Sequence, residues 1–190
     1  VAVAPSNPDV VWIGTGEDNA RNSVTFGDGV YKSTDGGKTF AHMGLRESLQ
    51  TGHIAIHHRD ADIVFVAALG RFWGANPDRG VFRTKDGGKT WRKVLYVDDA
   101  TGAIDVRVDP LEPSIVHACL YQVRRDEFCT NDPAVRFGEH AGYYRSEDGG
   151  DTWTRVTAGL PTCKWGRSGL TGFAPDPQKF DAAKAVVEKF

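Results

Sequence analysis

The stretch STDGGKTF (residues 33–40) recurs as TKDGGKTW (84–91) and again as SEDGGDTW (146–153). Asp86 follows Asp35 by 51 residues, and Asp148 follows Asp86 by 62. In each copy a hydroxyl residue stands two positions before the Asp of Asp-Gly-Gly, and Thr with an aromatic residue ends the motif. A period of this length indicates that one supersecondary unit is repeated along the chain.

A second pattern keeps the same phase. An alternating apolar run, a polar corner with Pro or Asp and a β-forming run occupy residues 1–13, 54–66 and 106–120. In the second copy this pattern predicts four strands, at residues 54–57, 63–68, 80–84 and 90–97. Asp-Gly-Gly suits the hairpin between the last two strands, because glycine supplies the positive φ that tight turns need. Four short strands per repeat predict a propeller blade.

We therefore predict an all-β chain: a single partial β-propeller segment over residues 1–190, with about three and a half four-stranded blades. The blades are expected at residues 1–46, 52–97 and 103–157, followed by a partial blade and a short C-terminal helix within 166–190. The helix is predicted because residues 181–190 are rich in helix formers and because Phe180, Ala183, Val187 and Phe190 share one helical face. A strand at residues 185–187 is the alternative.

Composition narrows the classes of function. A formal net charge of -2 gives no electrostatic reason to expect nucleic acid as a partner. No apolar run reaches eighteen residues, so no membrane span is expected. No signal peptide is expected at residues 1–5, which lack a basic segment and a long apolar one. The odd number of cysteines argues against a disulfide framework, although a Cys119–Cys129 pair stays open.

The repeats resemble those of the Asp-box (BNR-repeat) propellers, which include sialidases, xyloglucanases and the sortilin luminal domain. The resemblance covers residues 1–172 and is greatest to bacterial sortilin-like proteins, often labelled glycosyl hydrolases. It is carried by the three motifs and by residues 14–17, 21–23, 27–31 and 67–70. It implies the fold and a secreted or periplasmic location, but no single activity, because such repeats host many functions.

Three and a half blades cannot close a ring. The group that the chain resembles forms rings of six to ten blades, and an open blade face would be prone to aggregate. We expect the ring to be completed by a second copy of the chain or by the remainder of a longer propeller. Dimerisation is the preferred expectation for this chain in isolation.

The Asp boxes are expected on one rim of the propeller and the functional residues on the other. Asp35, Asp86 and Asp148 are therefore predicted to be structural. At the opposite rim, alignment of the first strands places His53 against Asp105. The candidate catalytic residues are Glu17, His53 and Asp105. The candidate ligand-binding residues are Arg21, Asn22, Arg71, Trp73, Arg107, Arg124 and Arg167. The guanidinium groups of the arginines among them suit an anionic or sugar ligand.

No residues are assigned to a metal site, and the sequence leaves the cofactor and any metal dependence open. The cluster of His57, His58, Asp60 and Asp62 is a weak metal candidate, because adjacent strand residues point to opposite faces. Two other weak alternatives are a cross-blade site of His53, His57 and Asp105, and a calcium site at Asp98 and Asp99. The sequence contains no G-x-S-x-G, H-E-x-x-H or C-x-x-C motif.

Two functions remain open. The first is a binding or assembly module that recognises a glycan, a peptide or an anionic small molecule at the axial mouth. The alternative is a hydrolase at the same mouth. It would be either a glycosidase with Glu17 and Asp105 as its two carboxylates, or a metal-assisted ester or phosphoester hydrolase with His53 and Asp105. The tyrosine–glutamate pair and arginine triad of sialidases match no definite positions.

Overall fold

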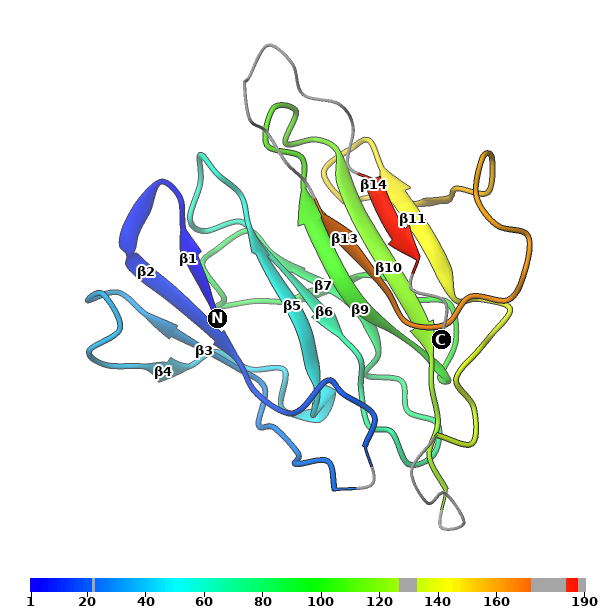
Figure 1. Cartoon of the computed structure of the whole chain (residues 1–190). Coiled ribbons are helices and arrows are strands. Elements are labelled where there is room, and N and C mark those ends of the chain that lie inside the picture. Colours follow the sequence, from blue (N-terminus) through cyan, green and yellow to red (C-terminus); the bar gives the residue numbers. More distant parts are fainter. Residues whose placement is uncertain (22, 127–132, 172–183, 188–190) are drawn as a thin grey trace.

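The structure is a computed structural model of residues 1–190, and it describes all of them except residues 22, 127–132, 172–183 and 188–190. Three four-stranded antiparallel sheets stand side by side, and a two-stranded sheet follows them (Figure 1). The strands of each sheet are paired in chain order. The chain therefore forms all-β blades that match part of a propeller.

The blade boundaries follow the repeat. The first sheet contains β1 (Ala2–Ala4), β2 (Asn7–Gly14), β3 (Val30–Ser33) and β4 (Ala41–His42), and a 3-10 turn follows at Arg46–Ser48. The second contains β5 (Thr51–Ile56), β6 (Val64–Ala68), β7 (Gly80–Thr84) and β8 (Arg92–Leu95). The third contains β9 (Thr101–Val108), β10 (Val116–Gln122), β11 (Gly142–Ser146) and β12 (Thr154–Arg155). β13 (Ser168–Thr171) and β14 (Lys184–Val187) form the two-stranded sheet.

The core lies between neighbouring blades. Trp12, Val30, Ile54 and Val66 belong to the cluster between the first and second sheets. A second cluster joins the second and third sheets, and a third joins the third sheet to β13 through Leu170. Burying each such aliphatic or aromatic side chain contributes roughly 1.5–3 kcal/mol. The blades are therefore held together mainly by apolar packing between their faces.

The predicted C-terminal helix is wrong where the structure describes it. Lys184–Val187 is strand β14, which pairs antiparallel with β13, and the alternative of a strand at 185–187 is confirmed. Helix propensity is a weak preference, and here the free edge of β13 gains a partner strand instead. Among the described residues the 3-10 turn at Arg46–Ser48 is the only helical element. The remainder of the predicted helix lies outside those residues.

Two other expectations concern disulfides and membranes. Cys119 is a buried free thiol, and burial raises its pKa. Cys129, the partner considered for it, lies outside the described residues. Within the described part of the chain, no helix has the length and the apolar character that a membrane crossing requires.

Each Asp box closes its hairpin with a carboxylate. Asp35 Oδ1 accepts hydrogen bonds from the backbone N–H groups of Lys38 and Thr39, both at 2.9 Å, and Oδ2 accepts one from the Thr39 hydroxyl at 2.7 Å. Asp148 accepts the same set at 2.9, 2.9 and 2.6 Å. Asp86 likewise accepts bonds from the N–H and hydroxyl of Thr90. The predicted structural role of the three aspartates is confirmed.

The hairpins lie on the rim that was predicted. The N–H of the first glycine in each box donates to a carbonyl in, or close to, the turn between the first two strands of its own blade. The three donor–acceptor pairs are Gly36 to Asp9 at 3.0 Å, Gly87 to Asp62 at 3.0 Å and Gly149 to Ser114 at 2.7 Å. These turns therefore share one rim, and the loops that connect second and third strands lie at the other.

The second glycine of a box sets how closely two blades approach. A Cβ on Gly88 would lie 2.5 Å from Cη2 of Trp12 in the preceding blade. Trp91 of the same box forms an edge contact with Trp12 and donates a hydrogen bond to the Met43 carbonyl at 2.7 Å. Gly150 would meet Phe65 of the second blade in the same way, at 2.8 Å. The box is thus both a turn and a surface of contact between blades.

This contact predicts a difference between two glycine substitutions. Gly149→Ala places a Cβ in open space at φ +70, so it should cost only the left-handed backbone penalty of about 1–2 kcal/mol. Gly88→Ala adds the clash with Trp12, and we expect a further loss of about 1–3 kcal/mol from overpacking. Urea unfolding of both variants measures the difference, and equal midpoints would contradict the close approach.

The boxes also predict an acid sensitivity. Hydrogen bonds from Thr152 and Ser146 lower the pKa of Asp148 below its usual value of about 3.8. A carboxylate whose folded pKa is depressed stabilises the protein above its unfolded pKa, and this stabilisation disappears as the pH falls through the folded value. The free energy of unfolding should therefore fall below about pH 4. Asp148→Asn should reduce the slope of the free energy of unfolding against pH between pH 4 and pH 2.5. Urea denaturation at each pH measures this slope, and an unchanged slope would refute the assignment.

Candidate functional site

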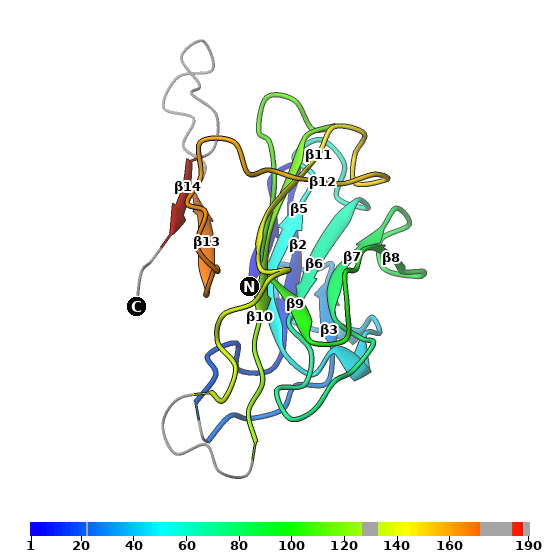
Figure 2. The same ribbon diagram turned by 90° about the vertical axis from the view of Figure 1, so that its right-hand side faces the viewer.

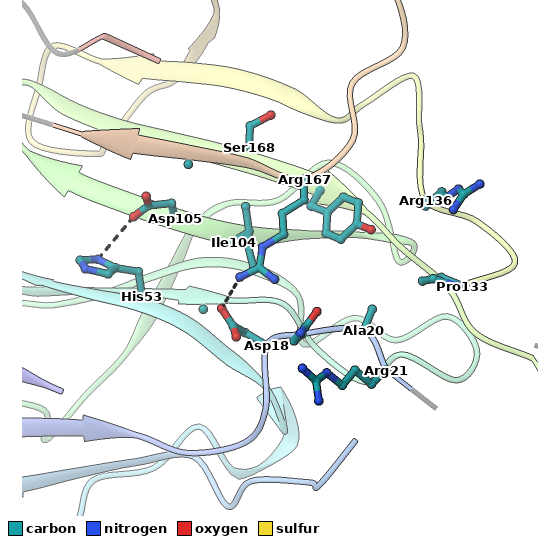
Figure 3. A pocket seen from close by; sticks show the side chains of 14 residues that line it. Asp18, Ala20, Arg21, His53, Ile104, Asp105, Pro133, Arg136, Arg167 and Ser168 are labelled. Carbon is teal, nitrogen blue, oxygen red and sulfur yellow. Dashed lines mark hydrogen bonds and ion pairs between the residues drawn. The ribbon is translucent and has the colours of Figure 1, made fainter. Parts of the chain in front are cut away.

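A cavity of about 770 Å³ opens at the rim opposite the Asp boxes (Figure 3). Its walls come from the loop after β2, from the first strands β5 and β9, from the end of β10 and the loop that follows, and from β13. The lining residues used below are Asp18, Arg21, His53, Asp105, Tyr121, Arg136 and Arg167. Residues from all four blades therefore meet at one mouth.

The first strands bring His53 and Asp105 together because they pack closely about the axis. A Cβ on Gly52 would lie only 2.2 Å from the Ile104 carbonyl oxygen, so glycine permits the approach of β5 to β9. His53 follows Gly52 on β5, and Asp105 follows Ile104 on β9. The alternation that the sequence predicted therefore places both side chains at the cavity wall.

His53 lies between a carbonyl and a carboxylate. Its Nδ1 is 3.0 Å from the Val106 carbonyl oxygen and 3.5 Å from Asp105 Oδ1. Burial lowers the pKa of His53, and the charge of Arg107 lowers it further, whereas Asp105 and the bond to Val106 act in the opposite direction. The neutral imidazole is thus favoured. With Nδ1 donating to Val106, Nε2 is the nitrogen with an accepting lone pair.

Asp105 links two blades. Its Oδ2 accepts a hydrogen bond from the Leu170 N–H of β13 at 2.8 Å. Its Oδ1 lies 3.2 Å from Arg107 Nε, an ion pair without the geometry of a hydrogen bond. Asp105 is only 8% exposed, so a nearby cation offsets part of the cost of burying its charge. The carboxylate therefore positions β13 as well as facing the cavity.

An ion pair spans the mouth between the first and last blades. Arg167 Nη2 donates to Asp18 Oδ2 at 2.9 Å, across 149 residues of sequence (Figure 3). Both side chains are partly exposed, at 39% and 33%, so the pair contributes at most about 1 kcal/mol to stability. Its effect is mainly on the shape and charge of the cavity wall.

Two buried arginines hold the loops of this rim. Arg79 is fully buried and donates to the carbonyls of Ala100 at 3.1 Å and Val123 at 3.2 Å. Burial lowers the pKa of Arg79 to about 10. Arg125 is 2% exposed and donates to the Ala20 carbonyl. The loops that carry the lining residues are therefore tied to one another across blades.

The structure brings four of the predicted site residues to the cavity: Arg21, His53, Asp105 and Arg167. The other described candidates lie outside its lining: Glu17, Arg71, Trp73, Arg107 and Arg124. Arg107 still contacts Asp105, and Trp73 packs against Phe26 with ring centroids 5.9 Å apart. Asn22 lies outside the described residues.

Sequence reasoning missed Asp18, Tyr121 and Arg136. Asp18 directly follows the predicted Glu17, whose N–H is bonded to the Thr25 carbonyl at 3.2 Å. Tyr121 lies at the end of β10, where alternation along the strand directs it to the same face as Cys119. The loop path that brings Arg136 to the mouth has no local sequence signal.

The described residues provide no cluster of ligands for the metal sites that were considered as alternatives. Among the described residues, no group of three or more His, Cys, Asp or Glu side chains is arranged to hold an ion. His57 Nδ1 accepts the N–H groups of Arg59 and Asp60, and Asp98 Oδ1 accepts that of Ala100. These side chains stabilise turns.

The environment of His53 predicts opposite effects for two neutralising variants. The pKa of His53 in the folded protein lies below its usual 6.5, so the unfolded chain binds more protons than the folded one. The free energy of unfolding should therefore fall as the pH drops below 6.5. Arg107→Met removes a repelling charge and should raise this pKa. Asp105→Asn removes an attracting one and should lower it. NMR titration of the imidazole Cε1–H measures both, and shifts in the same direction would refute this arrangement.

Comparison with known proteins agrees with this architecture. The family described as "Sortilin, neurotensin receptor 3" matches residues 28–186. A probable oligoxyloglucan-reducing end-specific xyloglucanase of Neosartorya fischeri is 30% identical over 137 residues, which are 72% of this chain and 15% of that protein. The chain thus spans less than a fifth of this curated relative.

Two solved structures share the fold. The chain superposes on an ancestral GH74 enzyme with a TM-score of 0.62 at 19% identity, covering 90% of this chain and 19% of that one. It superposes on the GH74 xyloglucanase from Xanthomonas campestris with a TM-score of 0.51 at 23% identity, covering 95% and 21%. At these identities the likeness concerns the fold alone. The matched family and the blade architecture lead to one conclusion: this chain is a β-propeller segment that belongs to the Sortilin-Vps10 family.

Proposed function

We propose that the axial mouth of this segment binds an anionic ligand, and that this ligand is an acidic glycan. The observation that carries the proposal is the charge of the cavity. Three guanidinium groups line it, from Arg21, Arg136 and Arg167, against the two carboxylates of Asp18 and Asp105. Each of these carboxylates already faces an arginine, Arg167 and Arg107 respectively. The guanidinium groups of the lining therefore outnumber its carboxylates.

The chemistry of the lining supports a sugar acid. A guanidinium group forks onto a carboxylate or sulfate with two parallel hydrogen bonds, which gives direction as well as attraction. Neutral His53 supplies an acceptor for a sugar hydroxyl. The curated relative is named for its action on a xyloglucan oligosaccharide, which supports a carbohydrate rather than a peptide as the ligand class.

Binding of a tri-galacturonate tests the proposal by calorimetry at low salt. Arg21→Gln and Arg136→Gln should each weaken binding about tenfold, since a charge-assisted hydrogen bond contributes roughly 1.5–3 kcal/mol. Arg124→Gln is the matched control, because Arg124 is exposed on the same rim but outside the lining. Affinity should fall as salt is raised.

Three outcomes would count against the proposal: absence of binding, equal binding of a neutral xyloglucan oligosaccharide, or equal weakening by Arg124→Gln. Inorganic phosphate serves as a separate probe. Phosphate binding as tight as that of the trisaccharide would contradict the proposal that the ligand is a glycan. It would still support the proposal that the ligand is an anion.

Hydrolysis is the second candidate, supported by two carboxylates at one cavity. A glycoside hydrolase needs a carboxyl group on each side of the scissile bond. Asp105 stays in this scheme, and Asp18 replaces Glu17 as its counterpart because Asp18 lines the cavity. Turnover of chromogenic and xyloglucan-derived glycosides that is lost in both Asp18→Asn and Asp105→Asn would support hydrolysis. Turnover that persists in both variants would exclude this pair.

A further inference from the structure

The two carboxylates that line the cavity are held in different ways. Asp105 lies on strand β9, its Oδ2 accepts the Leu170 N–H at 2.8 Å, and its side chain is 11% exposed. Asp18 lies on the loop after β2, and its side chain is 33% exposed. Among the residues that the structure describes, the Asp18 carboxylate accepts one hydrogen bond, from Arg167 Nη2 at 2.9 Å. A rotation of its side chain is therefore enough to release Asp18, whereas Asp105 is fixed between two strands.

The loop that carries Asp18 is anchored on both sides of it. The Glu17 N–H donates to the Thr25 carbonyl at 3.2 Å, and the Ala20 carbonyl accepts a hydrogen bond from the buried Arg125. The backbone of Asp18 is thus held in place at the mouth. A change of partner by its carboxylate requires a new side-chain rotamer and no movement of the loop.

Arg167 has more hydrogen-bond donors than Asp18 uses. Its side chain is 39% exposed, and within the described part of the chain its guanidinium group makes only the bond from Nη2 to Asp18. Arg167 directly precedes β13, and the β13–β14 pair lies beside the third sheet (Figure 2). A guanidinium group can donate two parallel hydrogen bonds to one carboxylate. An incoming carboxylate can therefore bind Arg167 in a geometry that Asp18 does not reach.

We propose that Asp18 is an internal competitor of the ligand: its carboxylate occupies the place on Arg167 that a carboxylate of the glycan takes on binding. The inference rests on the proposed function and deepens it, because it assigns the acidic group of the glycan to one arginine of the mouth. Asp18 turns toward solvent when the ligand binds. Because like charges repel, Asp18 also disfavours anions that do not replace its bond to Arg167. Asp18 is thus a specificity-determining residue of the site.

A supporting role for Asp18 predicts an effect of the opposite sign. If Asp18 held Arg167 in the orientation that the ligand needs, loss of the Asp18 charge would weaken binding. Removal of a competitor strengthens binding instead. The direction of the change in affinity therefore separates exchange from support.

Calorimetry with tri-galacturonate at low salt tests the exchange. Asp18→Asn keeps the shape of the side chain and should tighten binding about fivefold, which is the most that an exposed ion pair contributes. Arg167→Gln should weaken binding, because the place for the ligand carboxylate is lost. In the Arg167→Gln background, Asp18→Asn should lose most of its gain, and this double-mutant cycle measures the coupling of the two residues.

Glu139→Gln is the matched control. Glu139 is an exposed carboxylate on the loop after β10, outside the lining of the cavity, and its removal should change the affinity less than about twofold because salt screens exposed charges. Three results would overturn the exchange and leave the proposed function standing: Asp18→Asn that binds no tighter than the wild type, an equal gain from Glu139→Gln, or a gain that persists in the Arg167→Gln background. Absence of binding by the wild type and by Asp18→Asn alike would overturn both.

Discussion

The structure depends on a carboxylate satisfied by its own turn. The aspartate of each box accepts the amide and hydroxyl hydrogen bonds of the residues that follow it, so the turn is closed by its own side chain. The same bonds recur in all three blades. It can therefore serve as a fixed surface against which another blade packs.

The blades fit together because each Asp-box hairpin presents a hydrogen-bond acceptor and a residue without a side chain to the preceding blade. Its glycine carbonyl accepts a hydrogen bond from a cation of the preceding blade, Lys32 or Arg83, and the next glycine leaves room for a ring. A side chain in place of Gly88 would push the two blades apart. The spacing of the blades is thus decided at the outer hairpins as well as in the apolar core.

At the opposite rim, close packing of the first strands creates the cavity. Gly52 lets β5 approach β9 near Ile104, and His53 and Asp105 then face the axis from adjacent strands. The buried guanidinium of Arg79 binds carbonyls of two separate loops. Rigid strands and tied loops therefore present polar groups at a mouth whose cationic side chains outnumber its carboxylates.

The sequence by itself determined the blades, the Asp-box turns and the strand alternation that places His53 and Asp105 on one side, because these follow from local spacing and side-chain chemistry. Only the tertiary structure decided that Asp18 rather than Glu17 lines the cavity and that Arg136 reaches it, because loop paths depend on contacts between blades. It also decided that residues 184–187 form a strand, since pairing with β13 outweighs a weak helix propensity.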